Sequence, residues 1–196
     1  MHYFISDTHF SHVGAALGHS RRHFATIDDH DRALIEAWNS VVHPSDTVWH
    51  LGDFASDRPD PKDMRRIFSQ LRGSKHLICG NHDGNVVKEL GWSSVRDYAE
   101  LAVDKQRLVL SHYPMRVWNA MRRGAVQLYG HCHGRLPPNA QSIDIGVDVF
   151  GLAPVTWPQI RSRIAALPPL GFEDDTDAVD GLDVAPEAAV EDAWTL

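Results

Sequence analysis

The sequence predicts an α/β sandwich of two sheets with flanking helices. In the first half, short β-prone apolar runs alternate with helical patterns, which is typical of parallel βαβ units. From Ser94 to Val149 the apolar runs come closer together, which favours a second sheet that is mostly antiparallel. The chain has 196 residues, 43% of them hydrophobic, enough for one well-filled core. We therefore expect one domain over residues 1–166.

Start and stop signals define the expected helices. They cover residues 27–42, 61–72, 85–90 and 157–167. Thr26 is a suitable N-cap for the first helix, and Pro61 and Pro158 suit the first turns of the second and fourth. Gly73 and Gly91 follow the second and third, as helix-ending glycines do. The first three helices alternate with predicted strands, as in parallel βαβ units.

Five apolar runs are expected to be strands, and each one leads into a polar motif. The runs are residues 3–5, 47–49, 76–79, 107–110 and 126–129. A sixth segment, Ser142 to Val149, alternates with the period of a half-buried strand. Strands that end in polar motifs gather those motifs along one rim of a sheet, where loops can direct them at a common point.

The polar motifs contain seven side chains that can bind a metal. They are Asp7, His9, Asp53, Asn81, His112, His131 and His133. Carboxylate, imidazole and amide ligands together suit two hard or borderline divalent ions such as Mn, Fe or Zn, and no thiolate is required. The sequence therefore predicts a dinuclear hydrolase.

Taken singly, each motif has an ordinary explanation. Asp-x-His is common by chance, a lone Gly-Asp is usually a turn, and a lone His-x-His is usually exposed surface. In an extended segment, however, Asp7 and His9 lie on one side, as do His131 and His133. Asp53 can offer one oxygen to each of two ions. Five such motifs after five strands make a shared metal centre the better explanation.

Charge is distributed unevenly along the chain. Nine of the 26 acidic residues follow Arg163, where there is no Lys or Arg, so the preceding part has 17 acids against 19 Lys plus Arg, a net charge of about +2. This part suits an anionic substrate. Residues 167–196 are expected to be an acidic, poorly ordered tail that aids solubility, with partner binding as the alternative.

Cysteine content and hydropathy bear on the compartment. Two cysteines, Cys79 and Cys132, make a weak disulfide framework, and we expect both to be reduced. The chain starts without a basic and apolar leader, and no apolar stretch approaches the length that spans a bilayer. We expect a cytoplasmic protein without membrane association.

The ordered motifs Asp-x-His, Gly-Asp, Gly-Asn-His-Asp, His and Gly-His-x-His resemble the calcineurin-like metallophosphoesterase superfamily. The stretches Ile5–His12 and His50–Phe54 are similar to its small single-domain bacterial and phage members, and the similarity covers about residues 2–166. It implies a four-layer α/β-β/α fold of two mixed sheets flanked by helices, with two ions at one edge. The ions are expected to be Mn²⁺, with Fe, Zn and Ni as alternatives. It further implies that Asp7, His9, Asp53 and His133 bind the first ion and that Asp53, Asn81, His112 and His131 bind the second.

The expected reaction is in-line attack on phosphorus by a hydroxide that bridges the two ions. His82 is the expected general acid because the leaving oxygen needs a proton and imidazole titrates in the useful range. The resemblance gives His82 no metal-binding role. Asp83 either orients His82 or caps the following helix.

Substrate contacts are less defined by the sequence. The arginines on loops near the motifs can meet phosphate; they are Arg21, Arg22, Arg116, Arg122, Arg123 and Arg135. The loop after the first motif contains His12, His19 and His23, which can contact substrate or form polar loop surface. Tyr113 and Trp118 can stack on a nucleobase or simply pack. We expect a small phosphorylated substrate such as a nucleotide, and no stable nucleic-acid partner.

The motifs serve two reactions equally. A phosphodiesterase is the leading hypothesis and a phosphomonoesterase the alternative. A non-catalytic scaffold of the same fold would be expected to lose ligands and His82, all of which are present. A structural zinc protein would be expected to use cysteine ligands.

Overall fold

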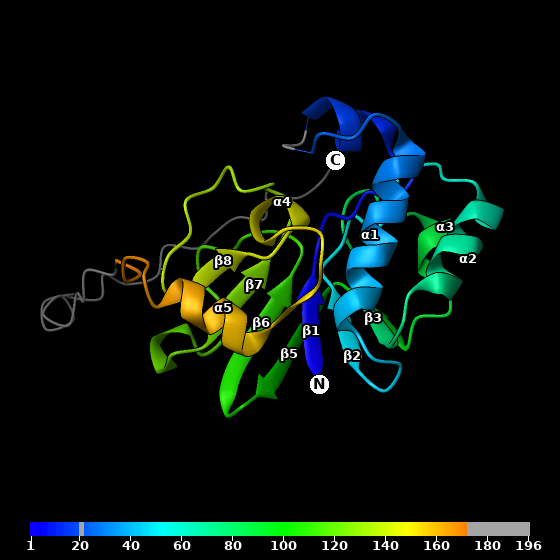
Figure 1. Cartoon of the computed structure of the whole chain (residues 1–196). Helices are drawn as coiled ribbons and strands as arrows, with labels where there is room; N and C mark the ends of the chain where they lie inside the picture. The colour runs from blue at the N-terminus through cyan, green and yellow to red at the C-terminus, as the bar shows by residue number, and fades with distance from the viewer. Residues whose placement is uncertain (20–21, 172–196) are drawn as a thin grey trace, which may run out of the picture.

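The computed structural model describes residues 1–19 and 22–171 (Figure 1). Two sheets pack against each other, and helices flank them. Helices α1 (Ile27–Val41), α2 (Pro61–Gln70) and α3 (Asn85–Lys88) lie on the outer side of the first sheet, while α5 (Trp157–Ile164) packs beside the second. The expected two-sheet α/β sandwich is confirmed.

The first sheet contains five strands in the order β4-β3-β2-β1-β9. They are β1 (His2–Ile5), β2 (Thr47–His50), β3 (Ser74–Ile78), β4 (Ser94–Arg96) and β9 (Val155–Thr156). The first four are parallel to one another, and β9 is antiparallel to β1. The expected βαβ units are confirmed, so β1, β2 and β3 all end at the same edge.

The second sheet has the order β5-β6-β7-β8. Its strands are β5 (Tyr98–Val103), β6 (Gln106–Ser111), β7 (Val126–Tyr129) and β8 (Ser142–Asp144). Only β5 and β6 are antiparallel, because they are joined by a tight turn in which Asp104 and Lys105 have φ of 50° and 67°. The links from β6 to β7 and from β7 to β8 each exceed ten residues, long enough to return to the same end of the sheet. The prediction of a mostly antiparallel second sheet is therefore wrong.

The alternating segment from Ser142 to Val149 is only partly a strand. β8 ends at Asp144, and the short helix α4 covers Val147–Phe150. The Asp144 carboxylate accepts hydrogen bonds from the amides of Gly134 (2.9 Å) and Gly146 (2.8 Å), which turns the chain after β8. Val147 is buried in the core under the helices. The apolar positions thus reflect burial on both sides of a turn rather than one long strand.

Side-chain hydrogen bonds fix the starts of the longer helices. The Thr26 hydroxyl accepts from the amide of Asp29 (3.1 Å), and Asp60 accepts from the second and third residues of α2 (2.7 and 3.1 Å). At α5 the Gln159 side chain accepts from the Thr156 amide (2.8 Å). The predicted helices are confirmed, although α2, α3 and α5 end two or three residues earlier than expected. Among the described residues, none of the helices is long and apolar enough to cross a membrane.

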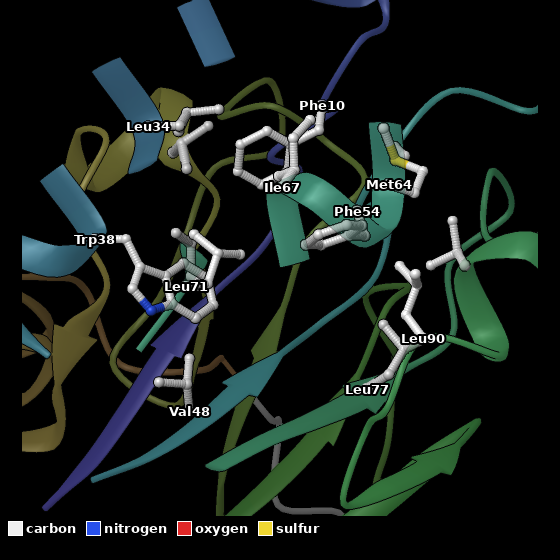
Figure 2. Packing of buried hydrophobic residues seen from close by; sticks show 14 of the residues in the cluster. Phe10, Leu34, Trp38, Val48, Phe54, Met64, Ile67, Leu71, Leu77 and Leu90 are labelled. Carbon is white, nitrogen blue, oxygen red and sulfur yellow. The ribbon is translucent and has the colours of Figure 1, made fainter. Parts of the chain in front are cut away.

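Two apolar cores hold the layers together. The first lies between the helices and the outer face of the first sheet, where Leu34 and Trp38 of α1 meet Ile67 of α2 (Figure 2). The second lies between the sheets and includes Phe4, Leu110, Leu128 and Ile143, together with Trp157, Ile160 and Ile164 of α5. Because both sheets bury residues on their facing surfaces, their edges are fixed relative to each other.

The packed part of the chain continues past residue 166. Leu167 packs against the core between the sheets, and the Pro168 carbonyl accepts a hydrogen bond from the Ala140 amide (2.8 Å). These residues had been assigned to the tail. The predicted acidic tail itself falls mainly on residues 172–196, which lie outside the described residues.

Ile67→Ala is predicted to lower the free energy of unfolding by about 2–5 kcal/mol, because Ile67 is fully buried between α2 and the sheet. The matched control is Val41→Ala at the end of α1, where the side chain is 40% exposed, and there the loss should stay within about 1 kcal/mol. Urea denaturation followed by circular dichroism measures both. Equal losses in the two variants would contradict the described core.

Candidate metal centre

Strands from both sheets end at one shared edge and supply the seven predicted metal-binding residues. Asp7, Asp53 and Asn81 follow β1, β2 and β3, while His112 and His131 follow β6 and β7. Backbone hydrogen bonds tie the loops together, from Asp7 N to Gly52 O (3.0 Å), His9 N to Asp53 O (3.0 Å) and Gly130 N to His112 O (2.9 Å). The rim predicted for one sheet is thus built from two.

The loops are coiled rather than extended. Left-handed backbone occurs at Asp7 (φ 58°), His9 (49°), Asp53 (56°), His131 (66°) and His133 (50°). This conformation is uncommon for residues with a side chain and collects at functional sites. The expectation that Asp7 and His9, and His131 and His133, share a face through extended backbone is wrong. Left-handed backbone at alternate residues instead places Asp7 and His9 in one cluster and divides His131 and His133 between two clusters.

Glycines let the loops approach closely. A Cβ on Gly80 would lie 2.3 Å from Asp53 Oδ1, and a Cβ on Gly130 would lie 1.9 Å from Ser6 Oγ. Only glycine fits at these positions, which explains the Gly that precedes the Asn81 and His131 motifs.

The first cluster contains Asp7, His9 and His133, whose ligand atoms all lie within 4.8 Å of one another. His9 Nε2 is 3.3 Å from His133 Nε2, and His133 Nε2 is 3.8 Å from Asp7 Oδ1. His9 Nε2 is also 3.7 Å from Asp53 Oδ2. These are the four residues expected to surround the first ion.

The second cluster contains Asp53, His112 and His131 within the same limit of 4.8 Å. His112 Nε2 is 3.5 Å from Asp53 Oδ2. Asn81 Oδ1 lies 3.2 Å from His112 Nε2 and 3.0 Å from His131 Nδ1. These are the four residues expected around the second ion. Asp53 Oδ2 lies between His9 of one cluster and His112 of the other, which is the arrangement that a shared ligand needs.

Hydrogen bonds orient two of the imidazoles toward the clusters. His112 Nδ1 donates to the Leu51 carbonyl (2.8 Å), and His133 Nδ1 donates to Asp148 Oδ2 (2.6 Å). Each ring then turns its Nε2 lone pair to its cluster. His9 Nδ1 lies 3.1 Å from His12 Nδ1, so His12, a predicted substrate residue, also contacts a buried imidazole.

The electrostatics of the clusters suit cations. Burial raises the pKa of Asp7 to about 7 and lowers the pKa of His9 to about 2. Burial acts to raise the pKa of Asp53 as well, but a hydrogen bond and the charge of His112 hold that pKa well below its usual range. Burial also acts to lower the pKa values of His112 and His133, but hydrogen bonds to Asp53 and Asp148 raise them above the usual value. The buried carboxylates thus attract positive charge, and the nitrogen and oxygen donors present fit two divalent ions.

Arg22 supports the first cluster from outside it. It is 7% exposed, and its guanidinium donates to both oxygens of Asp148 (2.9 and 2.7 Å). It also donates to the carbonyls of Asp7 (2.6 Å) and Thr8 (2.9 Å). The prediction that Arg22 contacts substrate is therefore wrong, because its donors hold the Asp7 loop and, through Asp148, the His133 ring.

Asp83 has a similar supporting position. Its carboxylate accepts from the amides of Gly80 (2.8 Å), Asp53 (2.9 Å) and Phe54 (2.9 Å). Helix α3 has Gly84 at its N-cap without a side-chain hydrogen bond. Neither predicted role, orienting His82 or capping the helix, matches these contacts. Asp83 joins the loops after β2 and β3, which carry Asp53 and Asn81.

The carboxylate that contacts His82 is Asp57, which the sequence analysis missed. Its Oδ1 is hydrogen-bonded to His82 Nδ1. His82 Nε2 lies 3.9 Å from Asp53 Oδ2, and His9, Asp53 and His82 form a third group of possible metal ligands. The available signal was a second acid four residues after Asp53 in one loop, but the loop conformation was needed to relate it to His82.

A pocket of about 380 Å³ opens beside the first cluster. It is lined by His9, His12, Gly14, Ala15, His82, His133 and Arg135. Of the predicted substrate residues, His12 lines it, Arg116 is exposed in the segment after β6, and Arg21 lies outside the described residues. A larger hollow of about 700 Å³ between residues 121–126 and α5 is lined by other residues, so the pocket at the clusters is the relevant one.

Asp148→Asn is predicted to weaken Mn²⁺ binding by roughly 10- to 100-fold, because it removes the charged acceptor that orients His133. Isothermal titration of the metal-free protein measures this directly. Asp57→Asn is the matched control, since Asp57 contacts His82 and lies in neither cluster. Unchanged affinity in Asp148→Asn, with its thermal unfolding also unchanged, would contradict the supporting role of Asp148.

Comparisons with known proteins agree with this geometry. The family model of the calcineurin-like phosphoesterase superfamily domain matches residues 1–144. The chain is 28% identical to uncharacterized protein MJ1445 of Methanocaldococcus jannaschii, over 79% of this chain and 85% of that protein. It is also 28% identical to the gene 66 protein of Mycobacterium phage L5, over 76% and 87% of the two chains. The crystal structure of AQ665, a protein of unknown function from Aquifex aeolicus, superimposes with a TM-score of 0.65 at 26% identity, over 84% of this chain and 99% of that one.

The chain belongs to the calcineurin-like phosphoesterase superfamily and is a metal-dependent phosphoesterase.

Proposed function

We propose that the protein is a phosphodiesterase that uses two divalent ions. The observation that carries this proposal is the position of Asp53, whose Oδ2 lies 3.7 Å from His9 and 3.5 Å from His112 in two adjacent clusters. An open pocket adjoins them and contains His82. A carboxylate shared by two ion sites suits two-metal phosphoester hydrolysis, because it holds the two ions close together.

In this proposal Asp7, His9, Asp53 and His133 hold one ion and Asp53, Asn81, His112 and His131 the other. The mixed nitrogen and oxygen donors suit Mn²⁺, Fe, Zn and Ni, of which we propose Mn²⁺. Two ions at such a site polarise the phosphoryl oxygen and supply a hydroxide for in-line attack near neutral pH. The chain's contribution is to fix the donors, through Arg22 and Asp148 on one side and Asp83 on the other.

His82 acts as the general acid that protonates the leaving oxygen. Three observations support this role: its side chain is 26% exposed, it lines the pocket, and its Nδ1 is engaged by Asp57. The Asp57 contact leaves Nε2 as the nitrogen that can face substrate. Asp57 is therefore proposed as the residue that positions His82.

The proposed substrate is a small phosphodiester, such as one derived from a nucleotide. The pocket of about 380 Å³ is within the range of small-molecule sites. We also propose a cytoplasmic location, which the two free cysteines, Cys79 and Cys132, support.

The proposal is tested by a screen of the purified, manganese-loaded protein. The substrates are bis(p-nitrophenyl) phosphate, p-nitrophenyl phosphate, and 2′,3′- and 3′,5′-cyclic nucleotides. Preferential hydrolysis of diesters is expected. Preference for the monoester would make the protein a phosphatase with the same site, and no turnover with both ions bound would leave a binding role and refute the proposal.

His82→Ala is predicted to retain both ions yet to lower kcat by roughly 10²- to 10⁴-fold on alkyl diesters, whose leaving groups need a proton. On p-nitrophenyl esters the loss should be much smaller, because p-nitrophenolate leaves without one. Asp57→Asn should show the same leaving-group dependence to a lesser degree. Metal analysis of each variant separates proton donation from metal binding. An equal decrease in kcat on both substrate types, or loss of an ion in His82→Ala, would contradict the role of His82 as general acid.

A further inference from the structure

We propose that Tyr113 is a specificity-determining residue. Its ring stacks on an aromatic group in the ester substituent that stays on phosphorus. This inference rests on the proposed phosphodiesterase function and identifies the substrate class as diesters that retain a nucleoside. The structural reason is that Tyr113 is an exposed aromatic side chain held in a fixed position beside the second cluster.

Tyr113 is not placed to stabilise a core. Its side chain is 49% exposed, and it belongs to neither of the two apolar cores. Trp118, the other aromatic residue in this segment, is half-buried, and its indole nitrogen donates to the Ala125 carbonyl (2.9 Å). Packing therefore accounts for Trp118 and leaves the position of Tyr113 unexplained.

The backbone of Tyr113 is nevertheless held firmly. Its carbonyl accepts hydrogen bonds from Ser111 Oγ (2.9 Å) and from Gln127 Nε2 (3.1 Å). Gln127 is fully buried and also accepts from the Met115 amide (3.1 Å), so it fixes both sides of this turn. An aromatic side chain on a fixed backbone has only two torsions left to order, so little conformational entropy is lost when a ligand packs on it.

The ring lies directly against the second cluster. Its centroid is 4.9 Å from the His112 ring and 4.7 Å from the His131 ring, and its hydroxyl is 3.5 Å from Asn81 Oδ1. His82, in contrast, lies beside the first cluster, with its ring centroid 5.2 Å from that of His9. Thus the proposed general acid flanks one cluster and the exposed tyrosine flanks the other.

These positions assign the two substituents of a diester to different sides. The leaving group must reach His82, because His82 gives it a proton. The substituent that remains on phosphorus then lies beside the second cluster, where Tyr113 exposes its aromatic ring. Stacking on a nucleobase tolerates any base, so it selects nucleosides over alkyl groups without selecting one sequence.

The test compares two substrates with the same leaving group. Methyl p-nitrophenyl phosphate and p-nitrophenyl thymidine 5′-phosphate both release p-nitrophenolate and differ only in the retained substituent. With the full-length, manganese-loaded protein, the thymidine ester should have the lower KM. Tyr113→Ala should raise that KM roughly 5- to 100-fold with kcat nearly unchanged. Tyr113→Phe and Tyr113→Trp, which retain an aromatic ring, should keep KM for the thymidine ester near the parent value. KM for the methyl ester should be the same in all variants.

Each contrary result has a distinct meaning. An unchanged KM ratio between the two esters in Tyr113→Ala overturns the inference. An equal rise in KM for the thymidine ester in Tyr113→Phe and Tyr113→Ala assigns the effect to the hydroxyl and overturns stacking. An equal rise in KM for both esters, together with the loss of a metal ion, assigns Tyr113 to the metal site and also overturns the inference. If the parent protein hydrolyses neither ester, the proposed function itself has failed.

Discussion

The buried carboxylate of Asp53 is the constraint on which the rest of the site depends. Its Oδ1 accepts the His82 amide (2.9 Å), while its Oδ2 lies between His9 and His112. Its own amide donates to Asp83 (2.9 Å), and its carbonyl accepts from the His9 amide (3.0 Å). A side chain that serves two clusters must be held to within about 0.5 Å, because a displacement would change the ligand geometry of both. The left-handed backbone and the close glycines are consequences of this requirement.

The fold supplies that precision through two sheets rather than one. Parallel strands β1, β2 and β3 of the first sheet and β6 and β7 of the second end at the same edge. Because a dry core lies between the sheets, ligands that come from different sheets keep a constant separation. Buried charges then connect the loops locally. Arg22 and Asp148 support the first cluster, and Asp83 connects the loops that carry Asp53 and Asn81.

Much of this organisation could be predicted from the sequence. Apolar runs identified the strands before each motif, and the order of the motifs identified the seven residues that the structure brings together. The direction of β7 and β8 could not be predicted, because periodicity reports burial and not the path of a connection. The roles of Arg22, Asp83 and Asp57 depend on which groups face each other across loops, and spacing along the chain does not contain that information. Polar residues near a motif are as suited to support its loops as to bind substrate.

The most direct test of the central claim is anomalous diffraction from crystals of the full-length protein grown with Mn²⁺. The account predicts two manganese peaks about 3.5–4 Å apart, both in contact with the Asp53 carboxylate. Asp7, His9 and His133 should surround one peak, and Asn81, His112 and His131 the other. A single peak at full occupancy, or two peaks of which only one contacts Asp53, would contradict the shared carboxylate.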